Sequence, residues 1–156
     1  MVQMALFRST LDTAYGELKL AVDTDGVLVE LWLPNRGRAA STRPPFPRAA
    51  AAGMRDAQQQ LVEYFSARRR SFDLPLAPRG TPFEQRVWRR LGEIPYGTTI
   101  SYGAIAAEFG LENGARAVGR VIGADGTLTG FGGGLPLKRA LLELEGAIAP
   151  DPPRLL

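Results

Sequence analysis

This 156-residue chain contains no Cys and no His, so its many arginines and its carboxylates are the first side chains to consider for chemistry. Without these two residue types, disulfides, thiol nucleophiles, zinc fingers and Ser-His-Asp triads are excluded. The carboxylates show no metal-ligand spacing, so we expect no metal and no other cofactor. Seventeen of the 19 basic residues are Arg, and the net charge of +3 permits nucleic-acid binding without demonstrating it.

Three short helices are expected between residues 80 and 119, and they would position the polar groups of this region. Thr81 can cap the first helix, and Glu84 follows three residues later, as in a capping box. Ser101 can cap the second helix, and the third covers roughly residues 114–119. Two helices joined by a short Gly-containing turn are typical of a helix-turn-helix.

The same region resembles a known family through several motifs in the expected order. These are Pro82-Phe83-Glu84-Gln85-Arg86-Val87-Trp88, Ile94-Pro95-Tyr96-Gly97, Ser101-Tyr102, Ala115-Arg116-Ala117-Val118-Gly119, Arg120-Val121-Ile122-Gly123 and Leu141-Leu142-Glu143-Leu144-Glu145-Gly146. They are similar to the C-terminal domain of the O6-alkylguanine-DNA alkyltransferases, also called methylated-DNA–protein-cysteine methyltransferases. The resemblance implies a DNA repair protein whose recognition helix enters the minor groove. In the family, guanine is flipped out of the stack and a Cys thiolate takes the alkyl group from its O6 atom.

One segment of the family pattern is missing from this chain. In the family, the end of the recognition helix, an Asn hinge and the Pro-Cys-His-Arg active site lie between the Ala-Arg-Ala-Val-Gly helix and the Arg-Val-Ile-Gly strand. Here Gly119 runs directly into Arg120. We therefore expect a member of the family that cannot transfer an alkyl group. We also expect weak, salt-sensitive DNA binding with little preference for alkylated guanine.

The resemblance implies roles for single residues. Arg116 matches the arginine finger that fills the gap left by the flipped base, and Tyr102 matches the tyrosine near the phosphate of that nucleotide. Glu145 matches the carboxylate of the catalytic network, although it has no His to act on here. The other matches are small residues that allow close approach to the groove, the Arg after the missing His, and a pocket residue that is often Tyr: Ala115, Ala117 and Gly119; Arg120; and Phe131. On spacing alone, a surface salt bridge, a core aromatic and helix–helix packing remain open alternatives.

The N-terminal half has a different pattern. Residues 4–33 alternate between apolar and polar, and Asp25-Gly26 is a hairpin signal, so we expect an antiparallel sheet of three strands. Residues 49–66 predict an amphipathic helix, which Arg68-Arg69-Arg70 follows, and residues 71–74 are a candidate strand. This half is similar, less specifically, to the N-terminal ribonuclease-H-like half of the same family.

An α+β protein of two domains is therefore expected. Residues 1–78 would form a small antiparallel-sheet, ribonuclease-H-like domain. Residues 79–156 would form a helix-turn-helix, winged-helix-like domain that binds DNA. Within the second domain, we expect residues 120–131 to form a hairpin and a last helix to carry Leu137 and Leu141.

Three functions stay open at this point. The chain is an alkyltransferase-family repair protein without its active-site segment, a non-catalytic lesion-binding protein similar to the alkyltransferase-like proteins, or a winged-helix transcription regulator whose wing is the hairpin at Asp125-Gly126. In each case, the expected partner is double-stranded DNA, bound by a monomer. No apolar run approaches the roughly 18 residues of a membrane span, and the N-terminus lacks the apolar core of a signal peptide. We therefore expect no membrane contact and a cytoplasmic location.

Overall fold

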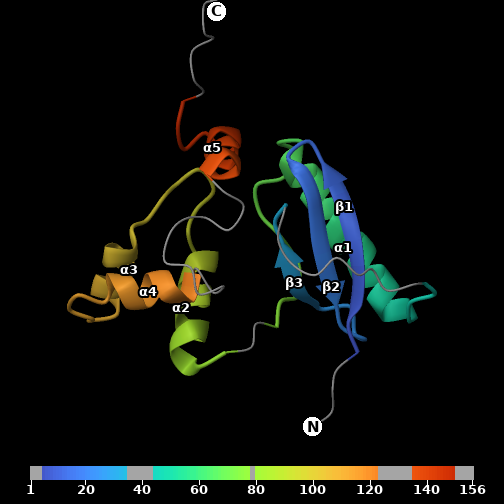
Figure 1. Ribbon diagram of the computed structural model, residues 1–156, viewed down its shortest axis with the longest axis horizontal. Coiled ribbons are helices and arrows are strands. Elements are labelled where there is room, and N and C mark those ends of the chain that lie inside the picture. The colour runs from blue at the N-terminus through green and yellow to red at the C-terminus, as the bar shows by residue number, and fades with distance from the viewer. Residues whose placement is uncertain (1–4, 35–43, 78–79, 123–134, 150–156) are drawn as a thin grey trace, which may run out of the picture. The chain divides into compact units, whose positions relative to one another are not determined.

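The structure is a computed structural model that describes residues 5–34, 44–77, 80–122 and 135–149. The chain divides into two compact units, Met1–Pro78 and Arg79–Leu156 (Figure 1). Each unit has its own cluster of buried apolar side chains. The described residues form three strands and five helices, which confirms the α+β class.

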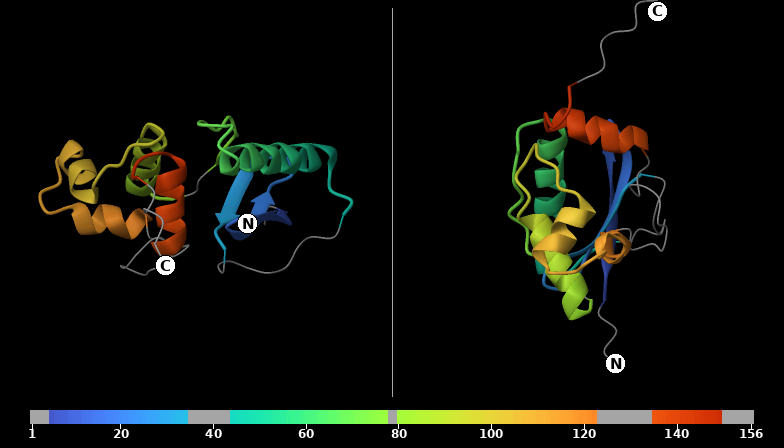
Figure 2. Two further views of the ribbon diagram at one scale, coloured as in Figure 1. Left: turned by 90° about the horizontal axis from the view of Figure 1, so that it is seen from above. Right: turned by 90° about the vertical axis from the view of Figure 1, so that its left-hand side faces the viewer.

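The first unit is an antiparallel sheet covered on one face by a long helix (Figures 1 and 2). Strands β1 (Phe7–Thr13), β2 (Gly16–Val22) and β3 (Leu28–Trp32) follow in the order β1-β2-β3. Helix α1 (Arg48–Phe65) packs against them. The buried core comes from alternate residues of β2 and one face of α1: Leu18, Leu20, Val22, Ala50, Met54, Ala57 and Leu61. Both the three-stranded sheet and the helix are confirmed.

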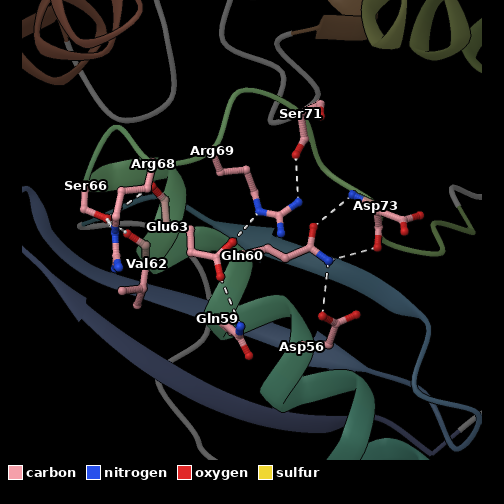
Figure 3. Close-up of polar contacts among 10 residues, drawn as sticks. All are labelled: Asp56, Gln59, Gln60, Val62, Glu63, Ser66, Arg68, Arg69, Ser71 and Asp73. Carbon is pink, nitrogen blue, oxygen red and sulfur yellow. Dashed lines mark hydrogen bonds and ion pairs between the residues drawn. The ribbon is translucent and has the colours of Figure 1, made fainter.

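The strand expected at residues 71–74 is wrong. Leu28 instead makes an isolated bridge with Leu76, and its N–H donates to the carbonyl oxygen of Pro75 at 3.1 Å. At Asp73, before this bridge, the buried side chain of Gln60 makes the hydrogen bonds that a neighbouring strand would otherwise make (Figure 3). The Gln60 amide nitrogen donates to the Asp73 carbonyl oxygen at 3.0 Å, and the Asp73 N–H donates to Oε1 of Gln60 at 2.9 Å. Because one amide satisfies both backbone groups of Asp73, no neighbouring strand is needed there.

Figure 3 shows local contacts of two of the three consecutive arginines after α1, Arg68 and Arg69. Nε of Arg69 donates to Oε2 of Glu63 at 2.7 Å, and Nη1 of Arg69 donates to the Ser71 carbonyl oxygen at 3.0 Å. Nε of Arg68 donates to Oγ of Ser66 at 3.0 Å. Hydrogen bonds from Gln59 and then Arg69 lower the pKa of the Glu63 carboxyl. These contacts favour a structural role for the arginines at the end of the helix.

The second unit contains α2 (Pro82–Gly92), α3 (Tyr102–Glu108), α4 (Ala115–Ile122) and α5 (Leu135–Leu144). The N-terminus of α2 has the expected capping box between Thr81 and Glu84, and the Oγ atom of Ser101 accepts from the Ala104 N–H at 3.1 Å. Both caps are confirmed. The buried core lies on the inner faces of α2, α3 and α4: Val87, Ile105, Ala106, Val118 and Val121.

The strand expected from Arg120 is also wrong, because residues 120–122 form the last turn of α4. Val118 and Val121 are three apart, and their exposed fractions are 0% and 8%. Apolar residues at this spacing share one face of a helix, so burial favours helix over strand. Helix α4 therefore has eight residues, just over two turns. The rest of the expected hairpin, with Asp125-Gly126 and Phe131, lies outside the described residues.

Candidate nucleic-acid interface

Helices α3 and α4 lie side by side and are joined by the turn at residues 109–114 (Figures 1 and 2). Two residues of this turn have left-handed backbone: Gly110 with φ of +70° and Asn113 with φ of +57°. Gly and Asn are the residue types that tolerate this conformation best, so the sequence allows a sharp change of direction between the helices. The result is the helix-turn-helix that the sequence predicts.

Helix α2 holds this helix pair through charged contacts. Nε and Nη2 of Arg90 donate to the two carboxylate oxygens of Glu108 at 2.6 and 3.0 Å, which joins α2 to the end of α3. The hydrogen bond from Arg90 lowers the pKa of the Glu108 carboxyl, and the same bond raises the pKa of Arg90. The guanidinium of Arg86 lies 4.0 Å from the ring centroid of Phe109, at the end of α3. These contacts join residues 18 or more apart, and the sequence pattern did not predict them.

Tyr102 and Gly119 meet where α3 and α4 cross. A Cβ atom on Gly119 would lie 3.0 Å from Cδ2 of Tyr102, closer than ordinary packing allows without a shift of the ring. The Tyr102 side chain is 46% exposed, so it is not a core aromatic. Glycine at this position therefore lets the tyrosine ring pack closely against α4 while part of it faces solvent.

The outer face of α4 carries two arginines. Arg116, Ala117 and Arg120 are exposed, whereas Ala115 and Gly119 are partly buried. Within the described part of the chain, neither Arg116 nor Arg120 makes an ion pair or a side-chain hydrogen bond. Arg116 therefore makes no surface salt bridge with those residues, which was the alternative to a DNA-contacting role.

Glu145 has a role that the sequence did not reveal. Its Oε2 atom accepts from the Gly97 N–H at 3.1 Å, and the neighbouring Tyr96 hydroxyl donates to the Leu144 carbonyl oxygen at 3.2 Å. Gly97 has φ of +75°, and a Cβ there would lie 2.6 Å from the Glu145 carbonyl oxygen. The end of α5 is thus fastened to the turn that leads into α3. The only local signal was the Pro-Tyr-Gly turn, which says nothing about a partner 48 residues away.

The described residues contain no group of three or more acidic side chains that could hold a metal ion. Nor do they include a helix that is long and apolar enough to cross a membrane. The polar side chains that α3 and α4 expose include Tyr102, Arg116 and Arg120.

The family model of the 6-O-methylguanine DNA methyltransferase DNA-binding domain matches residues 82–147. The methylated-DNA–protein-cysteine methyltransferase of Mycolicibacterium paratuberculosis is 42% identical over 158 residues, which cover 90% of this chain and 93% of that relative. The chain belongs to the methylated-DNA–protein-cysteine methyltransferase family. The constitutive family member of Bacillus subtilis is 35% identical over 89% of this chain and 94% of its own length.

Solved structures of the family have the same fold. The chain is 39% identical to the Mycobacterium tuberculosis O6-methylguanine methyltransferase, with a TM-score of 0.70 and coverage of 95% of this chain and 97% of that one. The M. tuberculosis OGT in complex with DNA is 40% identical, with a TM-score of 0.73 over 90% of this chain and 93% of that one.

The alignments also indicate missing positions. The M. tuberculosis methyltransferase is 50% identical over 109 residues, which are 66% of its length but only 60% of this chain. Sixty per cent of 156 residues is about 94, so about 15 aligned positions of the relative have no residue here. A gap of this size is in keeping with the direct junction of Gly119 and Arg120 and with the absence of Cys from this chain.

Proposed function

We propose that this member of the methyltransferase family binds double-stranded DNA and does not transfer an alkyl group. One observation carries the proposal: in a chain without Cys, α3 and α4 present Tyr102 and Arg116 on an exposed surface, and Arg116 has no ion-pair partner among the described residues. The DNA complex of the M. tuberculosis relative supports DNA as the partner. Repair of alkylated DNA is the setting in which the family works, so we assign the chain to lesion handling rather than to transcription.

Transfer requires a nucleophile that attacks the alkyl carbon while the bond from that carbon to O6 breaks. In the family this nucleophile is a thiolate, which is a strong nucleophile in its ionised form. Methionine has a neutral thioether, and tyrosine has a pKa near ~10, so neither supplies a comparable anion at neutral pH. Glu145 also lacks a His on which to act, and its carboxylate is engaged by the Gly97 N–H. The proposed activity is therefore binding alone.

Within this proposal, the helix-turn-helix of Arg79–Leu156 reads DNA, and Met1–Pro78 is the ribonuclease-H-like unit of the family. Arg116 fills the gap left by a flipped base, and Tyr102 lies near the phosphate of that nucleotide. Small side chains at Ala115, Ala117 and Gly119 allow α4 to approach the minor groove. The protein acts as a monomer in the cytoplasm. Phe131, the pocket residue of the sequence prediction, lies outside the described residues.

Fluorescence anisotropy with two matched duplexes, one carrying a single O6-methylguanine, tests the proposal. We expect weak binding to both, with affinities that fall together as salt rises from about 50 to about 200 mM. Arg116→Ala should weaken binding to both duplexes about tenfold, a change of about 1.4 kcal/mol. Arg139→Ala is the matched control, because Arg139 is an exposed cation on α5 with its own partner, Glu143.

Tight binding that selects the duplex with O6-methylguanine would contradict weak, unselective binding and would support the second candidate, a non-catalytic lesion-binding protein. No binding to either duplex would refute DNA binding altogether. A sequence-specific footprint on one operator would favour a transcription regulator. The hairpin turn at Asp125-Gly126, which would be the wing of such a regulator, lies outside the described residues.

A further inference from the structure

We propose that Arg120 and Arg116 together form a phosphate-binding pair on α4 that holds the backbone of DNA in which no base is flipped. At a flipped base, Arg116 fills the gap and Arg120 alone keeps its phosphate contact. This inference rests on the proposed DNA-binding function and adds a second cationic side chain on α4 that contacts DNA. The partner is the phosphate backbone of double-stranded DNA, and the contact requires no base pocket.

The helix places the two arginines on one face. Residues four apart on an α-helix are neighbours, with Cβ atoms about 5–6 Å apart. Both arginines are exposed, while Val118 and Val121 on the opposite face are buried in the core of the unit. This burial fixes how α4 is rotated, so the arginine pair has to face outward. Gly119 lies beside the pair, with the ring of Tyr102 against it.

Charge on this face is not neutralised by the described residues. Neither arginine has an ion-pair partner there, and the carboxylate of Glu108 on the adjoining α3 is occupied by Arg90. Glu112, in the turn before α4, is exposed and forms no ion pair with either arginine. The unit Arg79–Leu156 holds nine basic and eight acidic residues, a net charge of +1, so its overall charge attracts DNA only weakly. A positive potential at this surface must come from local pairing of cations, which α4 supplies.

The chemistry of the pair favours phosphate. A guanidinium presents a planar fork of N–H donors that matches two oxygens of a phosphate, and it stays charged at any physiological pH. Two such forks one helical turn apart suit neighbouring phosphates of one strand. Each phosphate that a cation neutralises releases counterions, which makes binding depend on salt but not on base sequence or alkylation.

The direct junction of Gly119 and Arg120 creates this arrangement. Because α4 continues through the junction to Ile122, Arg120 falls on the helix one turn after Arg116. An arginine that began a strand, as the sequence pattern predicts, would not share a helix face with Arg116. The chain that lacks the active-site segment therefore carries a second arginine on α4.

The test is the salt dependence of the dissociation constant for an unmodified duplex, measured with the full chain. Relative to the wild type, Arg120→Ala should reduce the slope of log affinity against log salt by about 0.9, the value for one phosphate contact. Arg116→Ala should act similarly, and the double variant should lose about twice as much. Arg120→Lys keeps the charge and should restore most of the slope. Arg139→Ala should leave the slope unchanged, and circular dichroism should show every variant folded, because the substituted side chains are exposed.

Two failures are distinguishable. If the wild-type chain binds the duplex and Arg120→Ala keeps the wild-type slope, DNA binding stands and the phosphate pair is refuted. If the wild-type chain does not bind the duplex at all, both the proposed function and the phosphate pair are refuted. A slope that falls for Arg139→Ala as much as for Arg120→Ala would also refute the pair, because the effect would then reflect overall charge alone.

Discussion

At the scale of single residues, two side chains fasten backbone segments that lack regular pairing. Glu145 accepts a hydrogen bond from the N–H of Gly97, and the buried Gln60 satisfies both backbone groups of Asp73. Each partner is distant in sequence, by 48 and 13 residues. A buried or partly buried backbone group without a hydrogen-bond partner lowers the free energy of unfolding. We therefore expect these two side chains to stabilise the fold more than side chains that make hydrogen bonds at the exposed surface. Neither role depends on the catalytic chemistry that the chain lacks.

Replacement of Glu145 tests its fastening role. Glu145→Ala should lower the free energy of unfolding by about 1.5–3 kcal/mol, because the Gly97 N–H loses a charged acceptor. Glu145→Gln retains an acceptor oxygen and should lose less. Urea denaturation followed by circular dichroism measures both. Glu93→Ala removes an exposed carboxylate from the same unit as a control, and a Glu145→Ala variant as stable as that control would contradict the role.

Gln60 offers a second test at this scale. Gln60→Leu has a similar size but leaves the N–H and carbonyl of Asp73 without the amide, so we expect a loss of about 1–3 kcal/mol in unfolding free energy. Gln59→Leu is the matched control, because Gln59 is the adjacent residue on α1 and its side-chain hydrogen bond to Glu63 lies at the exposed surface. Equal denaturation midpoints for the two variants would show that the amide contacts do not stabilise the first unit.

At the scale of elements, the sequence predicted the helix caps correctly, but it failed at the end of α4, where the residues suit both a helix and a strand. The caps at Thr81 and Ser101 could be predicted because each cap and its partner lie within three residues. The end of α4 could not be predicted, because Arg120-Val121-Ile122 contains β-branched residues and matches a strand in the family pattern. Val118 and Val121 are three residues apart and both are buried, and this spacing favours helix over strand at the end of α4. In the candidate interface, the sequence named Tyr102, Arg116 and Arg120 as candidates, whereas the exposure of all three and the lack of ion-pair partners of the two arginines among the described residues required the structure.

The link between α2 and α3 should respond to pH. The pKa of Glu108 is lowered in the folded protein, chiefly by its hydrogen bond from Arg90, so the pair stabilises the fold above the unfolded pKa of about 4.3. This stabilisation should disappear as the pH falls through the lowered folded value. Melting temperatures of the wild type and Glu108→Gln should therefore differ slightly at about pH 6 and converge as the pH falls below the lowered folded pKa of Glu108. Glu112→Gln controls for removal of an exposed carboxyl, and a wild-type advantage that grows on acidification would contradict the assignment.

At the scale of the whole molecule, the chain retains two units with separate cores although it lacks the nucleophile of its family. The first unit buries one face of a three-stranded sheet under α1, and the second packs three helices around Val87, Ile105 and Val118. Neither core includes residues of the Pro-Cys-His-Arg segment, because that segment is not present. Under the proposed function, folding and DNA binding are therefore separable from alkyl transfer.

Label transfer from a duplex containing tritiated O6-methylguanine tests this separation most directly. The purified chain would be incubated with the duplex, and the label would be measured in the protein after the DNA is digested. The M. tuberculosis relative serves as the positive control. We predict that all label stays with the DNA, even at protein concentrations where anisotropy shows the duplex bound. Tritium covalently attached to this Cys-free chain would contradict the account.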